Sequence, residues 1–382
     1  MHVLILGTRG VPSRHGGHET FAQDLALFLR ARGHFVTVYC QVEEGSSILE
    51  DTWRGIHRVL IPAKNSPAGT MLFDWKAIQH SLSAKGVMLT LGYNTAIFNL
   101  LHRLKRKPVV MNMDGIEWQR EKWSLAARVW FWLNELAGSR VANHLVADHP
   151  EIGLHLSRHT PEKKITMIPY GADTVNSAPM SVVQKYELIS KRYYLLIARP
   201  EPENRILEIV RTYSLRERGM PLVILGDYKS NVTRYKEAVL NAAGPEVKFL
   251  GAIFDREIVK ALRFHARAYV HGHHVGGTNP SMVESLAAGN AVIAHDNRFT
   301  RWVAGEGARY FTCSEDLDDI FESLSRDPSQ LLAMEEASRK RYHEAFTPDK
   351  TLTAYEQLLL QFAPPATIIP LRVPAAEAVH SA

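Results

Sequence analysis

Short apolar runs alternate with amphipathic stretches along most of the chain, and this order predicts an α/β architecture. In the first half, the runs that predict strands fall at residues 3–6, 35–40, 59–61, 86–91, 108–112, 144–147 and 164–169. Between the first two runs, apolar residues at helical spacing predict a helix that stops at Gly33: Phe21, Leu25, Phe28 and Leu29. A strand, a glycine-rich loop, a helix and a strand form a βαβ unit, which predicts a parallel sheet with ligands at the carboxyl ends of its strands.

The same pattern restarts after a polar bridge at 174–191, so a second doubly wound sheet is expected. Its strands are predicted at 194–198, 221–225, 247–250, 268–271 and 291–295. A further helix at 348–362 is expected to cross back to the first domain. We therefore predict two Rossmann-like domains that face a central cleft, over 1–175 and 176–347, then the returning helix at 348–363 and a flexible tail at 364–382.

Composition narrows the class of protein. The chain has 382 residues, too many for one ordinary core, and its 46% hydrophobic and 22% charged residues indicate a globular protein. Cys40 and Cys313 lie far apart in the sequence, which predicts no structural disulfide and a reducing, cytoplasmic setting. No apolar stretch approaches the ~18 residues that a membrane span needs. The N-terminus has no signal-peptide pattern, because a glycine loop follows its short apolar run at once.

A basic and aromatic segment at 96–140 predicts contact with a membrane surface. It holds eight Lys or Arg residues against four Asp or Glu, together with four tryptophans, within a chain of net charge +5. Basic residues beside tryptophans suit an anionic bilayer, here the inner face of the plasma membrane. A helix that packs its aromatic residues into the core and turns a basic face to water explains the same pattern. No nucleic-acid partner is expected.

The segment 271–297, HGHHVGGTNPSMVESLAAGNAVIAHDN, carries the densest group of candidate ligand-binding features. Gly276 and Gly277 have no Cβ, so backbone there can approach a ligand closely. Asn279 is a suitable N-cap and Pro280 a suitable first helical residue. The helix therefore directs free N–H groups and its positive dipole end at an anion above the glycines.

Within that helix, Ser281 and Glu284 are predicted to share a face away from the apolar residues Val283, Leu286 and Ala287. The Glu284 carboxylate can then accept hydrogen bonds from sugar hydroxyls. A helix start that binds phosphate, followed one turn later by a carboxylate, predicts a sugar-nucleotide site.

Other polar residues close to predicted strands are candidates for the same edge. Arg199 comes directly after a strand, where a guanidinium can grip phosphate with two hydrogen bonds. Asp114 either binds the acceptor and takes its proton, or makes an Asx turn. His271, His273 and His274 suggest a metal site or polar groups that line a pocket, and we favour the pocket because no Cys or carboxylate stands at ligand spacing.

Four segments together resemble the GT-B retaining glycosyltransferases of family four, in the rhamnosyltransferase branch whose N-terminal domain has no described function. They are GTRGVPSRHGGHETFA from Gly7, NMDGIEWQREKW from Asn112, ADHPEI from Ala147, and RPEPEN from Arg199 with GGTNPSMVE from Gly276. The similarity spans about residues 1 to 345. It implies transfer of L-rhamnose from dTDP-L-rhamnose to a lipid-linked saccharide acceptor in bacterial surface polysaccharide synthesis. Neither a cofactor nor a metal is expected.

The resemblance assigns the acceptor to the first domain and the donor to the second. Donor-binding residues are expected to be Gly16, Gly17, Arg199, Asn204, Arg205, Leu250, His271, Gly276, Gly277, Thr278, Asn279, Ser281 and Glu284. Acceptor-binding residues are expected to be Arg9, Arg14, Glu117 and Trp118, although a core position for Trp118 explains its sequence context as well. Asp114, Arg199 and Asn204 are the expected catalytic residues.

Two positions depart from the family pattern. The family has a glutamate eight residues before the one that matches Glu284, and Gly276 stands there in this chain. The family also has a lysine five residues after the arginine that matches Arg199, and Asn204 stands there, followed by Arg205.

Alternatives to the rhamnose donor remain open. The same fold can use a UDP- or GDP-sugar. An epimerase of sugar nucleotides would act on the donor without an acceptor, and a non-catalytic glycan-binding subunit would bind but not react. The glycine at 276 is the feature that favours this last class. A nicotinamide cofactor is not expected, because the first loop lacks the G-x-G-x-x-G spacing.

Overall fold

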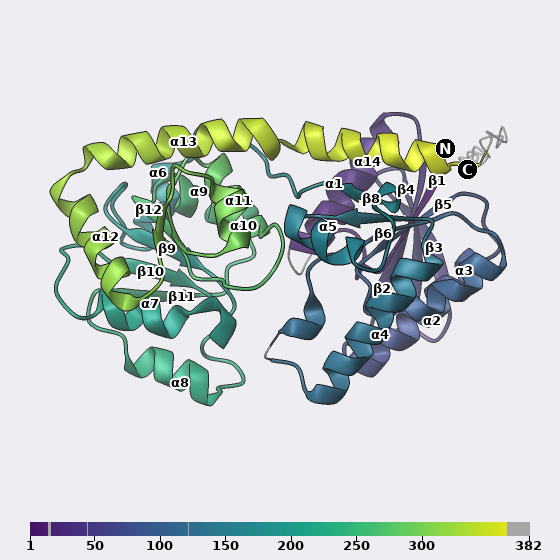
Figure 1. The fold of residues 1–382 in the computed structure, drawn as a ribbon, viewed down its shortest axis with the longest axis horizontal. Coiled ribbons are helices and arrows are strands. Elements are labelled where there is room, and N and C mark those ends of the chain that lie inside the picture. Colours follow the sequence, from purple (N-terminus) through teal and green to yellow (C-terminus); the bar gives the residue numbers. More distant parts are fainter. Residues whose placement is uncertain (14–16, 44, 121, 365–382) are drawn as a thin grey trace, which may run out of the picture.

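The computed structural model describes residues 1–13, 17–43, 45–120 and 122–364. They form two lobes, each built on a largely parallel β-sheet covered by helices, and two consecutive helices near the C-terminus extend across both lobes (Figure 1). The predicted α/β class with two doubly wound sheets is confirmed.

The first sheet has the strand order β3-β4-β2-β1-β5-β6-β7-β8. Its strands are β1 (His2–Leu6), β2 (Phe35–Val42), β3 (Leu49–Trp53), β4 (Ile56–Pro62), β5 (Val87–Leu91), β6 (Val109–Asn112), β7 (His144–Ala147) and β8 (Ile165–Met167). The pairings are parallel except that of β3 with β4. The sequence pattern does not predict β3, because this edge strand is mostly exposed and carries two acidic residues.

Helices cover both faces of the first sheet. They are α1 (Gly17–Ala31), α2 (Pro67–Ser81), α3 (Leu100–Leu104), α4 (Leu125–Val141) and α5 (Pro150–Ser157), with short 3₁₀ turns η1 (Ala96–Asn99), η2 (Glu117–Gln119) and η3 (Glu162–Lys164). Alternate residues of β1 enter the two cores: Val3 packs with α1 on one face, and Leu4 packs in the other core with Phe73 of α2 and Phe131 of α4. This alternation explains why a strand buried on both faces reads as a continuous apolar run.

The second sheet has the order β11-β10-β9-β12-β13-β14 and is parallel throughout. Its strands are β9 (Tyr194–Ile197), β10 (Leu222–Leu225), β11 (Val247–Gly251), β12 (Ala268–His271), β13 (Ala291–His295) and β14 (Arg309–Phe311). Its helices are α6 (Met180–Gln184), α7 (Ile206–Tyr213), α8 (Arg234–Asn241), α9 (Arg256–Phe264), α10 (Pro280–Ala287), α11 (Arg298–Ala304) and α12 (Ser314–Arg326), with the 3₁₀ turn η4 (Pro202–Asn204). The edge strand β14 is missed by the sequence pattern because it is short and partly exposed.

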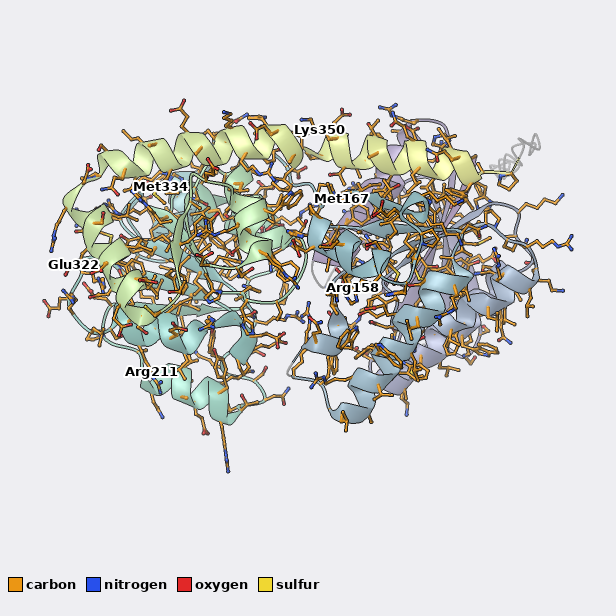
Figure 2. All side chains as sticks on the ribbon, viewed as in Figure 1. Arg158, Met167, Arg211, Glu322, Met334 and Lys350 are labelled. Carbon is orange, nitrogen blue, oxygen red and sulfur yellow. The ribbon has the colours of Figure 1, made fainter. Side chains whose placement is uncertain are left out.

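The last two helices connect the lobes. α13 (Ser329–Ala345) lies on the second lobe and α14 (Pro348–Phe362) on the first, nearly end to end (Figure 1). Lys350 marks the junction in Figure 2, and its ammonium donates to the carbonyls of His343 and Glu344, both at 2.7 Å. α14 is fixed to the first sheet by the Tyr355 hydroxyl, which accepts a hydrogen bond from Asn112 Nδ2 at 2.7 Å.

Two further expectations concern cysteines and membrane spans. Cys40 and Cys313 are both free thiols, as expected. Across the described ranges, the search for a helix with the length and hydropathy of a membrane span finds none.

Candidate functional site

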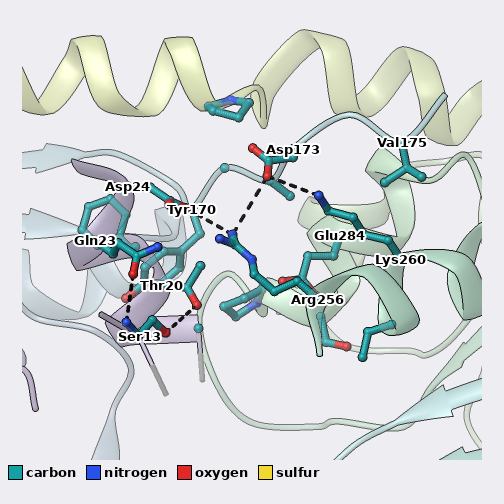
Figure 3. Close-up of a pocket in the computed structure, with 18 of the residues that line it drawn as sticks. Ser13, Thr20, Gln23, Asp24, Tyr170, Asp173, Val175, Arg256, Lys260 and Glu284 are labelled. Carbon is teal, nitrogen blue, oxygen red and sulfur yellow. Dashed lines mark hydrogen bonds and ion pairs between the residues drawn. The ribbon is translucent and has the colours of Figure 1, made fainter. Parts of the chain in front are cut away.

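A cavity of about 750 Å³ lies between the lobes and is lined from both. The first lobe contributes Thr20 and Asp24 from α1, and the second contributes residues of α9 and α10 (Figure 3). Of the predicted site residues, the cavity brings together Gly17, Ser281 and Glu284. Its volume lies within the range of about 300–1,000 Å³ that is typical of small-molecule sites.

One face of α9 lines this cavity with three cations, at positions i, i+4 and i+7. Arg256 Nη2 lies 3.3 Å from Asp24 Oδ2 across the lobes, and Lys260 Nζ lies 3.8 Å from Asp173 Oδ2 (Figure 3). Arg263, the third cation, is almost buried. Burial raises the pKa of the Asp24 carboxyl, and the Arg256 charge opposes this rise. These cations were not predicted from the sequence, although their spacing on one helix face was a signal for them.

Glu284 and Ser281 meet on Arg263. Arg263 Nη2 lies 2.5 Å from Glu284 Oε2 and donates to Ser281 Oγ at 3.0 Å. The Glu284 side chain is 40% exposed, whereas that of Arg263 is 5% exposed. The predicted common face of Ser281 and Glu284 is therefore present, and Asn279 caps α10 as predicted by accepting the Ser281 N–H at 3.0 Å. The site offers a carboxylate with an adjacent buried cation.

The loop after β9 presents Arg199 beyond the cavity. The Arg199 side chain is 68% exposed, and its Nη1 lies 3.9 Å from Glu201 Oε1. Asn204 is buried and donates from Nδ2 to the Arg199 carbonyl at 2.8 Å, so it holds the loop in shape. Arg205 pairs with Glu208 at 2.7 Å. A Cβ on Gly272 would lie 2.3 Å from the Asn204 carbonyl oxygen, so only glycine there lets this loop pack against the end of β12.

Two cations of the first lobe, Arg120 and Lys122, approach this loop. Arg120 Nη1 lies 3.6 Å from Glu203 Oε1, and Lys122 Nζ lies 3.4 Å from Glu201 Oε1. Arg120 also pairs with Glu117 at 2.8 Å. Arg199 therefore stands in a charged zone shared by the two lobes.

None of the described residues predicted for acceptor binding lines the cavity. The Trp118 indole donates to Glu135 Oε2 at 2.9 Å and packs on the first core, which supports the core interpretation. The Glu117 carboxylate accepts from the Trp123 indole at 3.2 Å. Arg9 is exposed and does not line the cavity. Arg14 and the donor candidate Gly16 lie outside the described residues.

Asp114 and Asp148 follow the neighbouring strands β6 and β7. Asp114 has φ 48°, and its N–H donates to Asn112 Oδ1 at 2.7 Å, so Asn112 rather than Asp114 makes the Asx turn. Asp148, which the sequence analysis did not single out, is buried against Thr278 of the second lobe. Burial, and then the charge of Asp114, raises the pKa of Asp148 well above its usual range. The sequence segment ADHPEI contains this residue, but only the folded structure shows that its partner is Thr278.

Two of the three histidines stack on each other at the end of β12. The rings of His271 and His273 are stacked, with centroids 4.2 Å apart. Burial lowers the pKa of His271 to about 3 and that of His273 well below its usual value. Within the described residues no group of three or more His, Cys, Asp or Glu is placed to hold a metal ion. The pocket-lining interpretation also fails for the cavity, which His271 does not line.

The remaining predicted donor residues lie outside the cavity lining. They are Arg199, Asn204, Arg205, Leu250, Gly276, Gly277, Thr278 and Asn279. Gly276 and Gly277 face the first lobe, since a Cβ on Gly115 would lie 3.8 Å from the peptide that joins them. The predicted donor-binding residues therefore lie in three places: the cavity, the charged zone around Arg199, and the glycine loop at Gly276 and Gly277.

Comparison with solved structures decides the fold. Sucrose-phosphate synthase from Thermosynechococcus elongatus superimposes with a TM-score of 0.78 at 14% identity, covering 94% of this chain and 98% of that one. HepE from Anabaena, in complex with UDP-glucose, gives a TM-score of 0.72 at 15% identity, covering 94% and 100%. A glycosyltransferase from Rickettsia africae gives 0.68 at 15% identity, covering 94% and 98%.

The chain has the GT-B fold. A family model described as a domain of unknown function (DUF1972) matches residues 1–173, somewhat less than half of the chain. A comparison with curated protein sequences found no match.

Proposed function

We propose that this protein is a retaining glycosyltransferase of family four, in the rhamnosyltransferase branch. It would transfer L-rhamnose from dTDP-L-rhamnose to a hydroxyl of a lipid-linked saccharide in bacterial surface polysaccharide synthesis. The observation that carries the proposal is the cavity of about 750 Å³ between the lobes, where Glu284 of α10 stands beside the buried Arg263 of α9.

The cavity suits a nucleoside. Ile197, Ile253 and Val259 give it an apolar wall for a base, and the half-exposed Glu284 carboxylate can accept a hydrogen bond from the sugar of the nucleoside. Arg263 holds that carboxylate in position, with Nη2 at 2.5 Å from Glu284 Oε2. The base and its sugar are thereby fixed on the second lobe.

The start of α10 and Arg199 then serve the diphosphate. When the bond between the sugar and the diphosphate breaks, positive charge develops on the sugar and negative charge on the leaving phosphate. N–H groups at a helix start and a guanidinium stabilise that negative charge. The acceptor hydroxyl attacks the same face, and the leaving phosphate oxygen takes its proton. Asp114, at the end of β6, is positioned on the acceptor lobe.

A UDP-sugar is the second candidate donor. Two of the similar structures are described with a UDP-sugar bound. One is HepE in complex with UDP-glucose, and the other is a protein from E. coli described as trehalose-6-phosphate bound with UDP-2-fluoro glucose. Thymine differs from uracil only by one methyl group, so the donor screen must include both.

A membrane surface is the proposed partner of the first lobe. Helices α2, α3 and α4 lie together on one side of this lobe (Figure 1). Their exposed large apolar side chains are Met71, Leu72, Ile97, Leu100, Leu104, Leu125, Val129, Trp132 and Leu133, which we call the α2–α4 apolar face, with Ile97 from the adjoining η1. Exposed cations border it at Arg103, Lys105, Arg106 and Arg128. Apolar anchors within a basic border suit an anionic bilayer, where a lipid-linked acceptor resides.

Incubation with radiolabelled donor tests the proposed activity. The protein is incubated with dTDP-L-rhamnose or UDP-glucose, with and without lipid-linked oligosaccharide, and the label is separated into lipid, free sugar and nucleotide fractions. We expect label in the lipid fraction only when acceptor is present. Free or isomerised sugar without acceptor would identify an epimerase instead, and binding without turnover would identify a glycan-binding subunit.

A further inference from the structure

The carboxylate of Asp148 lies on the glycine loop of the opposite lobe. Asp148 directly follows β7 and is 2% exposed. Its Oδ2 accepts the Thr278 N–H at 2.9 Å, and the Thr278 hydroxyl donates to its backbone carbonyl. Since the partners come from different lobes, this contact exists only when the lobes are closed on each other.

The glycine loop is shaped to admit this carboxylate. A Cβ on Gly277 would lie 2.3 and 2.6 Å from the two carboxylate oxygens of Asp148, so any side chain there would displace it. Gly276 has φ 140°, a conformation that L side chains rarely adopt, so this backbone cannot carry an acidic residue at 276 without strain. The acidic group at this place therefore comes from the first lobe.

Only one oxygen of this carboxylate is satisfied. Oδ2 has the Thr278 N–H, while Oδ1 is buried and has no hydrogen-bond partner in the part of the chain that the structure describes. A buried carboxyl oxygen without a hydrogen-bond partner is costly. Because burial and the charge of Asp114 raise the pKa of Asp148, its carboxyl group can be protonated, and a hydroxyl suits Oδ1 in either state since it both donates and accepts. What completes the site is therefore a ligand with a hydroxyl group.

Position restricts that donor to one part of the ligand. Asp148 sits at the loop that precedes α10, whereas Glu284 lies one turn inside the helix and lines the nucleoside cavity. If the nucleoside occupies the cavity and the diphosphate the helix start, the transferred sugar reaches the loop. A sugar presents hydroxyl donors, and a diphosphate presents only acceptors.

We propose that Asp148 binds a hydroxyl of the transferred sugar through Oδ1, with Oδ2 held in place by Thr278. This rests on the proposed glycosyltransferase function and names the group that recognises the donor sugar. It also makes sugar recognition dependent on closure, because the carboxylate and the nucleotide site belong to different lobes. Asp148 therefore contributes nothing to the binding of a nucleoside diphosphate that carries no sugar.

Calorimetric titration with four ligands tests this role: dTDP, dTDP-L-rhamnose, UDP and UDP-glucose. The pair of interest is the one that the wild type binds, dTDP with dTDP-L-rhamnose or UDP with UDP-glucose. Asp148→Ala is expected to lower the affinity for the sugar nucleotide ~10-fold or more, as for a lost hydrogen bond to a charged group. The affinity for the nucleoside diphosphate without sugar should stay within about twofold of the wild-type value. Asp148→Asn keeps the side-chain volume and an acceptor for Thr278, and it should weaken the sugar nucleotide in the same direction. Gly277→Ala keeps the carboxylate but displaces it, so it should behave like Asp148→Ala.

Asp319→Asn on the exposed face of α12 serves as the matched control, and melting temperatures show that each variant is folded. Equal affinity of wild type and Asp148→Ala for the sugar nucleotide would overturn this role alone. Tighter binding of bare diphosphate by Asp148→Ala would also overturn it, by showing that the carboxylate blocks the phosphate site. Failure of the wild type to bind any of the four ligands would overturn the proposed function, and this role with it.

Discussion

Arg263 and Glu284 show how a carboxylate that is proposed to bind a ligand also stabilises the protein itself. Arg263 is 5% exposed and its guanidinium needs an anion, since an unpaired buried charge costs several kcal/mol. Glu284 supplies it at 2.5 Å while keeping 40% of its side chain accessible. Removing the side chain would therefore damage stability and binding together. Glu284→Gln is the better substitution, because an amide oxygen still accepts from Arg263.

The stacked His271 gives the protein a specific acid sensitivity. Burial lowers its pKa to about 3, so below pH 6.5 the unfolded chain takes up a proton that the native state does not. Stability should therefore fall as pH decreases from 7 towards 3. His271→Gln cannot take up this proton, and its loss of unfolding free energy between pH 7 and pH 5.5 should be smaller by about 1 kcal/mol.

Chemical denaturation at the two pH values measures this difference. The exposed His343 provides the control, and His343→Gln should show the wild-type pH dependence. An identical slope for wild type and His271→Gln would show that His271 does not remain neutral in the native state.

Residues within one element were predictable, and contacts between lobes were not. Helical periodicity placed Ser281 and Glu284 on one face, and residue preference identified Asn279 as the cap. No local pattern could join Asp148 to Thr278, which is 130 positions away. The same limit applies to Asp24, whose partner Arg256 lies in the other lobe.

At the scale of elements, burial decides what the sequence reveals. The strands buried on both faces, such as β1 and β7, were predicted with their bounds nearly correct, because an apolar run marks them. The edge strands β3 and β14 have exposed residues and charges, so their patterns resemble loops. The predicted β11 at 247–250 also lies at an edge and was found, since it retains three apolar residues.

Helix α4 has its polarity partly reversed. Asn134 and Glu135 are buried, whereas Leu125, Val129 and Leu133 are exposed at intervals of four residues. The tryptophans of the segment 96–140 divide accordingly: Trp118, Trp123 and Trp130 pack against the core, and Trp132 is exposed. The core interpretation therefore holds for three of the four tryptophans, and membrane contact stays a prediction. An apolar stripe that faces outwards on a surface helix indicates a partner.

Leu125→Glu with Val129→Glu tests whether that partner is a bilayer. Both side chains are exposed, at 77% and 48%, so the fold should tolerate the change. In sedimentation with vesicles containing phosphatidylglycerol, the double variant should bind at least ~10-fold less than wild type, because each buried apolar side chain contributes about 1.5–3 kcal/mol. Leu215→Glu with Leu332→Glu, exposed at 67% and 70% in the second lobe and α13, is the matched control. An equal loss of vesicle binding in both double variants would contradict membrane contact through the α2–α4 apolar face.

At the scale of the whole molecule, the lobes meet through buried contacts, such as that of Asp148 with Thr278, and through weaker exposed ones. The ion pairs Arg256–Asp24 at 3.3 Å and Arg298–Glu151 at 3.1 Å are partly exposed, and such pairs contribute at most about 1 kcal/mol each. α13 and α14 run nearly end to end across both lobes (Figure 1). A ligand that contacts both lobes would add to the contacts between them and favour the closed arrangement, which would exclude water during the proposed transfer.

The proposed function depends on the binding of a nucleoside diphosphate in the cavity beside Glu284. Isothermal titration of dTDP and UDP into wild type, Glu284→Gln and the control Glu187→Gln tests this most directly; the Glu187 side chain is 90% exposed. We expect the wild type and Glu187→Gln to bind one nucleotide per chain with equal affinity, and Glu284→Gln to bind it ~10-fold more weakly, because a charge-assisted hydrogen bond is lost. No binding by the wild type, or equal binding by all three proteins, would contradict the account.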